Sequence, residues 1–159
     1  MTDNVNPFSK ILVAFDGSTP SMDAVDYAIE ISMKYESSLT VIHVIDGYKY
    51  PYLLSSFVLA PTFGSEKYDE ERKKFQSMMK TVEEKYYEKN KDEKGTLLKT
   101  EIVESSTSVA ATIVEYGESH DVNLIIVGSR GRTGFKKMLI GSVASDVLKY
   151  AHSPVLIVR

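Results

Sequence analysis

The chain contains no cysteine among its 159 residues, and that absence excludes several kinds of chemistry. Disulfide bonds, thiol nucleophiles and cysteine-bound metals cannot form. The three histidines offer no metal site in their place, because His43, His120 and His152 show neither i,i+4 nor paired spacing. We expect His43, which lies in a predicted strand, to be a partly buried structural residue. No Ser-His-Asp constellation or nucleophile elbow is visible either.

Long apolar runs and a strong excess of one charge are missing as well. No apolar run approaches the length of a membrane span. The N-terminal sequence MTDNVNPFSK lacks the basic region and apolar stretch of a signal peptide. The formal net charge of −3 argues against a nucleic-acid coat or a general membrane-surface binder. We therefore expect a cytoplasmic protein with no nucleic-acid and no membrane partner.

The pattern of apolar residues predicts an α/β fold in one domain that spans residues 1–159. Short, mostly β-branched runs predict five buried strands, at 11–15, 39–45, 97–103, 124–127 and 155–158. Helical spacing predicts four helices between them, one starting at Pro20 and the others at 67–90, 109–117 and 143–150, with Ser142 as the cap of the last helix. Ser18 or Thr19 is expected to cap the first helix. This alternation is typical of a doubly wound parallel sheet, although the residues alone leave the strand order open.

Two segments in the middle of the chain, 46–66 and 67–90, carry more than half of the aromatic residues. The stretch 46–66, rich in tyrosine and phenylalanine, predicts a long loop that packs on its own domain, on a partner subunit or on a ligand, and we favour its own domain. In the helix at 67–90, a stripe from Phe75 to Tyr86 is expected to belong to the core. The paired carboxylates Glu70-Glu71 and Glu83-Glu84 are expected to lie on its solvated face.

The most informative stretch is 124–143, LIIVGSRGRTGFKKMLIGSV. Its apolar strand is followed by Gly128, Gly131 and Gly134, then by basic residues, and finally by Gly141-Ser142 just before a helix. Glycine lets a ligand approach the backbone closely, and exposed amides together with a helix N-terminus form a cradle for anions. Mobile cations would come from four side chains: Arg130, Arg132, Lys136 and Lys137. The alternative is a glycine-rich turn on a solvated basic loop with no ligand.

The spacing of these glycines excludes two established phosphate-binding motifs and fits a third pattern. A P-loop, G-x-x-x-x-G-K-S/T, is absent, and so is the dinucleotide fingerprint G-x-G-x-x-G. The pattern Gly128-x-x-Gly131, nine residues, Gly141-Ser142 resembles the nucleotide-binding signature of the ATP-binding branch of the universal stress protein family. The segments KILVAFDGS, VIHVID and PVLIV occur in the same order as in that family, so the resemblance covers nearly the whole chain.

The resemblance implies a strand order of 3-2-1-4-5 and a ligand, ATP or another adenine nucleotide, with Mg²⁺. In open α/β sheets, ligands bind beyond the carboxyl ends of the strands where the strand order reverses, which here lies between Asp16 and Gly128. By position, Asp16 would contact the adenosine and help hold the metal, and Val44 would contact the adenine. Gly128 and Gly131 would bring amides to the ribose and phosphates. The terminal phosphates would lie on the start of the last helix, at Gly141, Ser142 and Val143. Without a ligand, Asp16 would be a turn residue that caps the first helix.

One segment departs from the family pattern. The family commonly has Gly-x-Pro after its third strand, where this chain has Thr107-Ser108-Val109. The run of hydroxyl residues at 105–108 could donate hydrogen bonds to a ligand, or it could be a polar loop that caps the next helix. We favour the cap.

Three functions fit these observations. The first is an ATP-binding regulatory module of the stress response. The second is a slow ATPase, or an adenylyl- or phosphoryl-transfer enzyme, although Asp16 is the only carboxylate expected near the site and efficient hydrolysis would need more. The third is a stress-associated dimer that binds no nucleotide. The apolar strand at 155–158 is expected at a sheet edge, which predicts a homodimer that pairs through it.

Overall fold

In the computed structural model, five parallel strands form one sheet in the order β3-β2-β1-β4-β5. The structure describes residues 6–50, 65–91, 97–131 and 140–159. The strands are β1 (Lys10–Ala14), β2 (Ser38–Asp46), β3 (Leu98–Ser105), β4 (Leu124–Gly128) and β5 (Val155–Val158). This order confirms the expected doubly wound α/β sheet.

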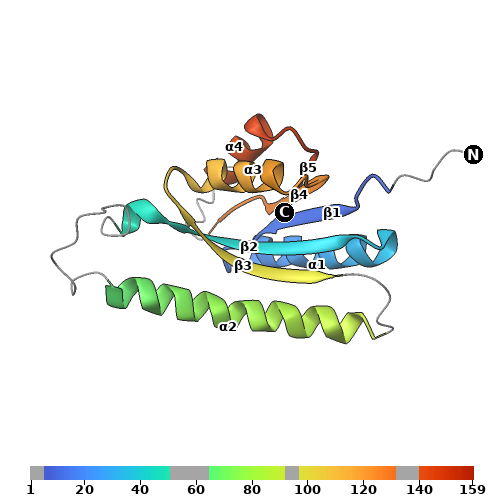
Figure 1. The fold of residues 1–159 in the computed structure, drawn as a ribbon, viewed down its shortest axis with the longest axis horizontal. Helices are drawn as coiled ribbons and strands as arrows, with labels where there is room; N and C mark the ends of the chain where they lie inside the picture. Colours follow the sequence, from blue (N-terminus) through green and yellow to red (C-terminus); the bar gives the residue numbers. More distant parts are fainter. Residues whose placement is uncertain (1–5, 51–64, 92–96, 132–139) are drawn as a thin grey trace, which may run out of the picture.

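Helices cover both faces of the sheet, as Figure 1 shows. The helices α1 (Thr19–Tyr35) and α2 (Ser65–Lys89) pack on one face, and α3 (Val109–Ser119) and α4 (Ser142–Tyr150) pack on the other. A 3₁₀ turn, η1 (Gly47–Lys49), follows β2. Right-handed crossovers of strand, helix and parallel strand produce this arrangement.

The core is split into two layers because successive strand residues point to opposite faces of the sheet. On the first face, Val13 and Val41 pack with Ile29 of α1 and with Phe75 and Tyr86 of α2. The predicted stripe on α2 is therefore confirmed as core. The second layer consists of strand residues such as Leu12, Ile42 and Val127, packed against Ile113 of α3 and Val147 of α4.

The helix starts differ in a way that affects the site. Ser18 caps α1 by accepting from Ser21 N, and Ser108 caps α3 by accepting from Ala111 N. The sequence predicted a third cap, Ser142 on α4, and that prediction is wrong. The N-cap is Gly141, whose carbonyl accepts from Ser145 N at 2.9 Å and which makes no side-chain cap hydrogen bond. Ser142 is instead the first residue of the helix.

Two side chains are less exposed than the sequence led us to expect. His43, expected to be partly buried, is only 2% exposed. Glu71, expected on the solvated face of its helix, has a side chain only 13% exposed and accepts a hydrogen bond from Tyr50 Oη. Glu83 accepts one from Thr100, whereas Glu70 is exposed as expected.

Part of what the sequence predicted lies outside the described residues. This applies to most of the loop at 46–66, of which the structure describes Asp46 to Tyr50 and the start of α2. It applies also to Gly134 and to three of the four predicted cations, Arg132, Lys136 and Lys137. No helix in the described part of the chain is long and apolar enough to cross a membrane.

Candidate functional site

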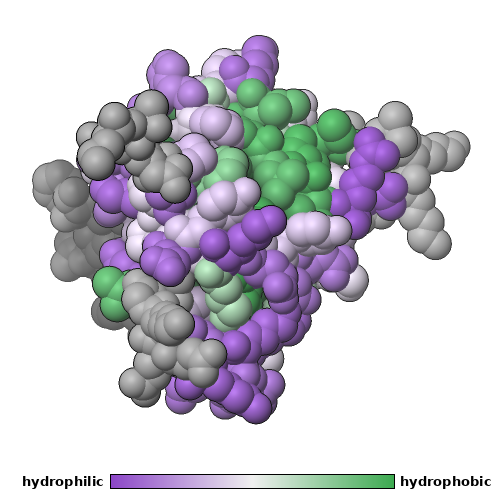
Figure 2. Space-filling model, turned by 90° about the vertical axis from the view of Figure 1, so that its right-hand side faces the viewer, coloured by the Kyte–Doolittle hydropathy of each residue, from purple (hydrophilic) through white to green (hydrophobic). Residues whose placement is uncertain are grey.

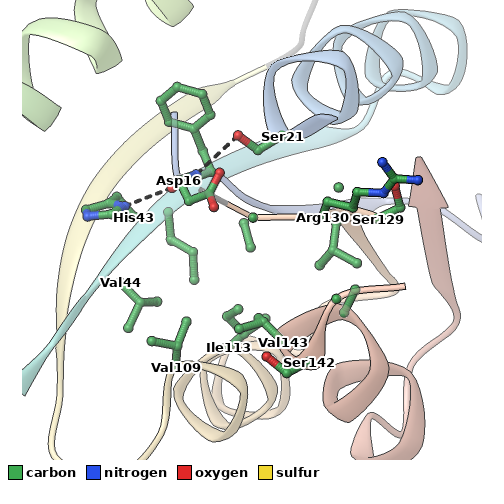
Figure 3. A pocket seen from close by; sticks show the side chains of 18 residues that line it. Asp16, Ser21, His43, Val44, Val109, Ile113, Ser129, Arg130, Ser142 and Val143 are labelled. Carbon is green, nitrogen blue, oxygen red and sulfur yellow. Dashed lines mark hydrogen bonds between the residues drawn. The ribbon is translucent and has the colours of Figure 1, made fainter. Parts of the chain in front are cut away.

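A pocket of about 130 Å³ opens at the carboxyl edge of the sheet, beside β1, β2 and β4 and the start of α4 (Figure 3). All eight residues that the sequence assigned to a site lie around it: Asp16, Val44, Gly128, Arg130, Gly131, Gly141, Ser142 and Val143. They come from four separate segments of the chain. The fold therefore brings together the residues that the sequence pattern selected.

One side of the pocket is apolar. Val44 comes from β2, Val109 and Ile113 come from α3, and Val143 comes from α4, and Figure 3 shows them around one side of the cavity. Val44 is 8% exposed and Ile113 is 1% exposed, so this wall is fixed by the core. The sequence did not single out Val109 and Ile113 as site residues, because their helical spacing is also that of ordinary core residues. An apolar wall of this kind suits the flat face of a planar ring.

Asp16 is held at the opposite side by hydrogen bonds to the start of α1. Its backbone N–H donates to Ser21 Oγ at 3.3 Å, and its Oδ1 accepts from Ser18 N at 3.0 Å. Gly17 between them has φ +82°, a conformation that L side chains rarely adopt. The turn role considered for Asp16 is therefore confirmed, although the residue that caps α1 is Ser18 and not Asp16. It is compatible with a site role, because Oδ2 points toward Gly131, where an added Cβ would lie 2.8 Å from it.

The loop after β4 is fastened to three other segments. Ser129 N donates to Val158 O of β5 at 2.5 Å, and Ser129 O accepts from Gly141 N at 2.6 Å. Ser18 Oγ donates to the carbonyl of Arg130 at 3.3 Å. Ser129, which is 3% exposed, therefore joins the two glycine segments. Sequence reasoning missed it as a site residue, although its place between Gly128 and Arg130 was the available signal.

The start of α4 presents backbone donors to the pocket. The first N–H groups of a helix have no intrahelical acceptor, and they carry the positive end of the helix dipole. In α1 and α3 a serine side chain satisfies one of these donors, whereas no side chain of the described residues does so at α4. Gly141, Ser142 and Val143 all line the pocket. This geometry suits an anionic group such as phosphate.

Charged side chains at the pocket are few. Asp16 is the only carboxylate, and Arg130 the only full cation, among the described lining residues. Arg130 is exposed and lies at the rim (Figure 3). No group of three or more candidate metal-ligating residues occurs within the described ranges. A metal ion here would need additional ligands from a bound molecule.

The hydroxyl-rich loop after β3 does not reach the pocket. Ser108 caps α3, and Ser105 Oγ accepts from Thr107 N and from Thr112 Oγ1. Among the residues from 105 to 109, Val109 alone lines the cavity. The favoured interpretation of this run as a capping loop is confirmed.

Comparison with known proteins identifies the family. Residues 7–159 match the model of the universal stress protein family. The chain belongs to that family. It is 35% identical over 156 residues to the universal stress protein MJ0531 of Methanocaldococcus jannaschii, which covers 97% of this chain and 84% of the relative. It is 32% identical over 154 residues to YxiE of Bacillus subtilis, covering 96% and 99% of the two chains.

Solved structures of the family share the fold. UspA from Lactobacillus plantarum superposes with a TM-score of 0.78 at 25% identity, covering 96% of this chain and 98% of the other. Two more distant structures are complexes with nucleotides. One is a universal stress protein with cAMP (20% identity, TM-score 0.59), and the other is from Archaeoglobus fulgidus with dAMP (19% identity, TM-score 0.63). They cover 96% of this chain and 97% and 98% of their own. At these identities the likeness concerns the fold.

Proposed function

We propose that this universal stress protein binds an adenine nucleotide, ATP with Mg²⁺, in the pocket at the carboxyl edge of the sheet, and that it acts as a regulatory module. The observation that carries the proposal is the convergence of four segments on one pocket with an apolar wall at one side and uncapped backbone donors at another. Structures of distant family members with cAMP and dAMP support the same class of ligand.

Each part of the nucleotide has a matching surface. The adenine would lie against the apolar wall, with Val44 on its face. The Asp16 carboxylate would accept from the ribose hydroxyls, and Gly131, which lies opposite, would let the sugar approach the backbone. The phosphates would lie on the amides of Ser142 and Val143, with Arg130 at the rim. The Gly141 amide already donates to Ser129 O, so Gly141 would contribute open space beside the helix start rather than a donor. Each charge-assisted hydrogen bond to a phosphate contributes about 1.5–3 kcal/mol, more than the 0.3–1 kcal/mol typical of the helix dipole.

The donor set around Asp16 fits a magnesium ion only in the presence of phosphates. Mg²⁺ usually keeps several water molecules and binds through one or two carboxylates together with substrate phosphates. The described pocket supplies one carboxylate, Asp16, whose Oδ2 points toward Gly131. Asp16 would hold the ion, and the ion would neutralise part of the phosphate charge. The single carboxylate favours binding over efficient hydrolysis, because phosphoryl transfer needs a positioned nucleophile as well as a held metal.

We also propose that the protein is a homodimer that pairs through β5. This strand lies at the edge of the sheet, and three of its four residues are partly exposed. Figure 2 shows an apolar area in the upper half of the molecule, the half in which Figure 1 places β4, β5 and α4. An unpaired apolar edge strand invites association, and a twofold mate would cover it. The cytoplasmic location expected from the sequence stays a prediction.

Titration calorimetry with Mg-ATP tests the nucleotide site. The wild-type protein should bind one nucleotide per chain, and Gly141→Val should weaken binding roughly tenfold or more, the equivalent of about one charge-assisted hydrogen bond. Ser145→Val, an exposed position further along α4, is the matched control and should bind like the wild type. Absence of heat with the wild type at millimolar Mg-ATP would refute the proposal and favour a dimer without nucleotide.

A further inference from the structure

A buried histidine connects the pocket to the opposite face of the sheet. His43 lies on β2 and is 2% exposed. Its Nδ1 is 2.9 Å from the carbonyl oxygen of Phe15, the residue before Asp16 (Figure 3). A carbonyl can only accept a hydrogen bond, so Nδ1 carries the hydrogen and donates it. This bond holds the peptide that leads directly into Asp16.

The other side of the imidazole faces α2. The ring stacks on Phe75, with ring centroids 3.3 Å apart and an angle of 8° between the planes. Nε2 lies 4.0 Å from Glu71 Oε1, and the other carboxylate oxygen of Glu71 accepts from Tyr50 Oη at 2.5 Å. A line of polar groups therefore runs from Asp16 through Phe15 and His43 to Glu71 on α2 and Tyr50 after η1.

The charge of Glu71 determines whether it strengthens or weakens the hydrogen bond from His43 Nδ1 to the Phe15 carbonyl. A carboxylate beside Nε2 draws positive charge onto the imidazole, and a more positive ring is a stronger donor at Nδ1. The burial of both side chains strengthens this influence, because the surrounding dielectric constant is low. Tyr50 keeps the Glu71 carboxylate in place. The firmness with which the Phe15–Asp16 peptide is held therefore depends on groups that are outside the pocket.

We propose that His43 is a positioning residue of the nucleotide site and that Glu71 and Tyr50 control how firmly it fixes Asp16. This inference rests on the proposed nucleotide-binding function. By thermodynamic linkage, a ligand that requires Asp16 in place must also strengthen the attachment of α2 at Glu71, by the same factor that Glu71 strengthens ligand binding. The state of the pocket is thereby transmitted through the sheet to the first half of α2.

The first test uses the protein without nucleotide. The ¹⁵N NMR signals of the His43 imidazole report which nitrogen carries hydrogen and how each is polarised. The wild type should show hydrogen on Nδ1, and Glu71→Gln should shift the His43 signals. Glu70→Gln, a neighbouring exposed carboxylate on the same helix, is the matched control and should leave them in place. Tyr50→Phe should shift them in the same sense as Glu71→Gln, to a smaller degree.

The second test measures nucleotide affinity in a double-substitution cycle. Glu71→Gln should weaken Mg-ATP binding about three- to tenfold, which corresponds to the net contribution of the hydrogen bond from His43 Nδ1 to the Phe15 carbonyl. In a His43→Asn background, where the amide can still donate near the Nδ1 position but cannot reach Glu71, the same substitution should have no effect. His43→Phe, which keeps a ring on Phe75 but has no donor, should bind more weakly than His43→Asn.

These outcomes separate the inference from the function on which it rests. If the wild type binds Mg-ATP but Glu71→Gln and Glu70→Gln have equal affinities, the inference is overturned and the nucleotide site stands. If the His43 signals do not shift in Glu71→Gln, the inference fails whether or not nucleotide binds. If the signals respond but the wild type binds no nucleotide, the proposed function is refuted and the coupling to nucleotide with it.

Discussion

Gly128 and Gly141 line the same pocket, but the fold requires only the first of them. A Cβ at Gly128 would lie 2.7 Å from the carbonyl carbon of Pro20 and from Ser21 N, both of which are backbone atoms that cannot move aside cheaply. A Cβ at Gly141 would come no closer than 3.4 Å to a described atom, and its φ of −71° is open to any residue. The glycine at 141 is therefore better explained by access to the helix start than by folding.

This difference makes a paired prediction. Gly128→Ala should lower the free energy of unfolding by about 1–3 kcal/mol, since overpacking against backbone forces a shift. Gly141→Ala should change it by less than about 1 kcal/mol, the range of an N-cap substitution. Urea denaturation of both variants measures the difference. Equal losses for the two would contradict the distinct roles assigned to these glycines.

At the scale of single residues, the sequence predicted what depends on a local pattern and missed what depends on distant partners. The glycine spacing selected Gly131 and Gly141 without a structure. The burial of Glu71 could not be predicted, because on its own helix it belongs to a charged run. Only the fold brings Tyr50 and His43 to it from other segments.

At the scale of elements, a group of charged and hydrogen-bonding side chains joins β3 to α3. Glu101 lies 2.7 Å from Lys99 Nζ and accepts from Tyr116 Oη of α3 at 2.6 Å. The hydrogen bond from Lys99, with a second from Tyr116, holds the pKa of Glu101 below its usual 4.5. Burial, followed by the hydrogen bond to Glu101, raises the pKa of the Tyr116 hydroxyl above 10.0.

The lowered pKa of Glu101 makes part of the stability depend on pH. A carboxyl group with a depressed folded-state pKa stabilises the fold above its unfolded pKa, and this stabilisation is lost as pH falls through the folded value. Because the Glu101 side chain is 37% exposed, the effect should stay below about 1 kcal/mol. Glu101→Gln should flatten the decrease in stability between pH 5 and pH 3, measured by urea denaturation at each pH. Glu115→Gln, on the exposed side of α3, should not; equal flattening in both variants would contradict the role of Glu101.

The helix caps show how far sequence can define an element. The hydroxyl run at 105–108 was expected to cap the helix that follows, and Ser108 does so. The sequence identified the capping loop but did not choose Ser108 over its neighbour Thr107. Gly141 and Ser142 are adjacent and both residue types are common N-caps, so residue preference alone could not choose between them. The five strands were recognisable from their apolar runs. Their order was not, because every parallel pairing buries similar side chains, and only the family resemblance supplied it.

At the scale of the whole molecule, groups from both faces of the sheet meet at its carboxyl edge. The pocket is bordered by α3 and α4, and His43, which also lines it, stacks on Phe75 of α2. The edge strand β5 is attached to the pocket loop through Ser129 N and Val158 O. A partner that pairs with β5 would therefore lie close to the glycine segment.

The proposed dimer predicts a measurable mass. Light scattering after size-exclusion chromatography should give twice the mass of the chain at micromolar concentration. Ile157→Lys, which places a charge on the partly exposed edge strand, should give the mass of one chain. Lys49→Ala, an exposed position in η1, should leave the dimer intact. A wild-type protein with the mass of one chain would count against pairing through β5.

The central claim, an adenine nucleotide in the pocket at the carboxyl edge, is tested most directly by mapping backbone amide NMR signals during a titration with Mg-ATP. The account predicts the largest shifts at Asp16, Val44, 128–131 and 141–143, with saturation at one nucleotide per chain. Shifts confined to another surface, such as the groove between α2 and β3 lined by Arg72, Lys73 and Lys80, would contradict it, and so would no shifts at all.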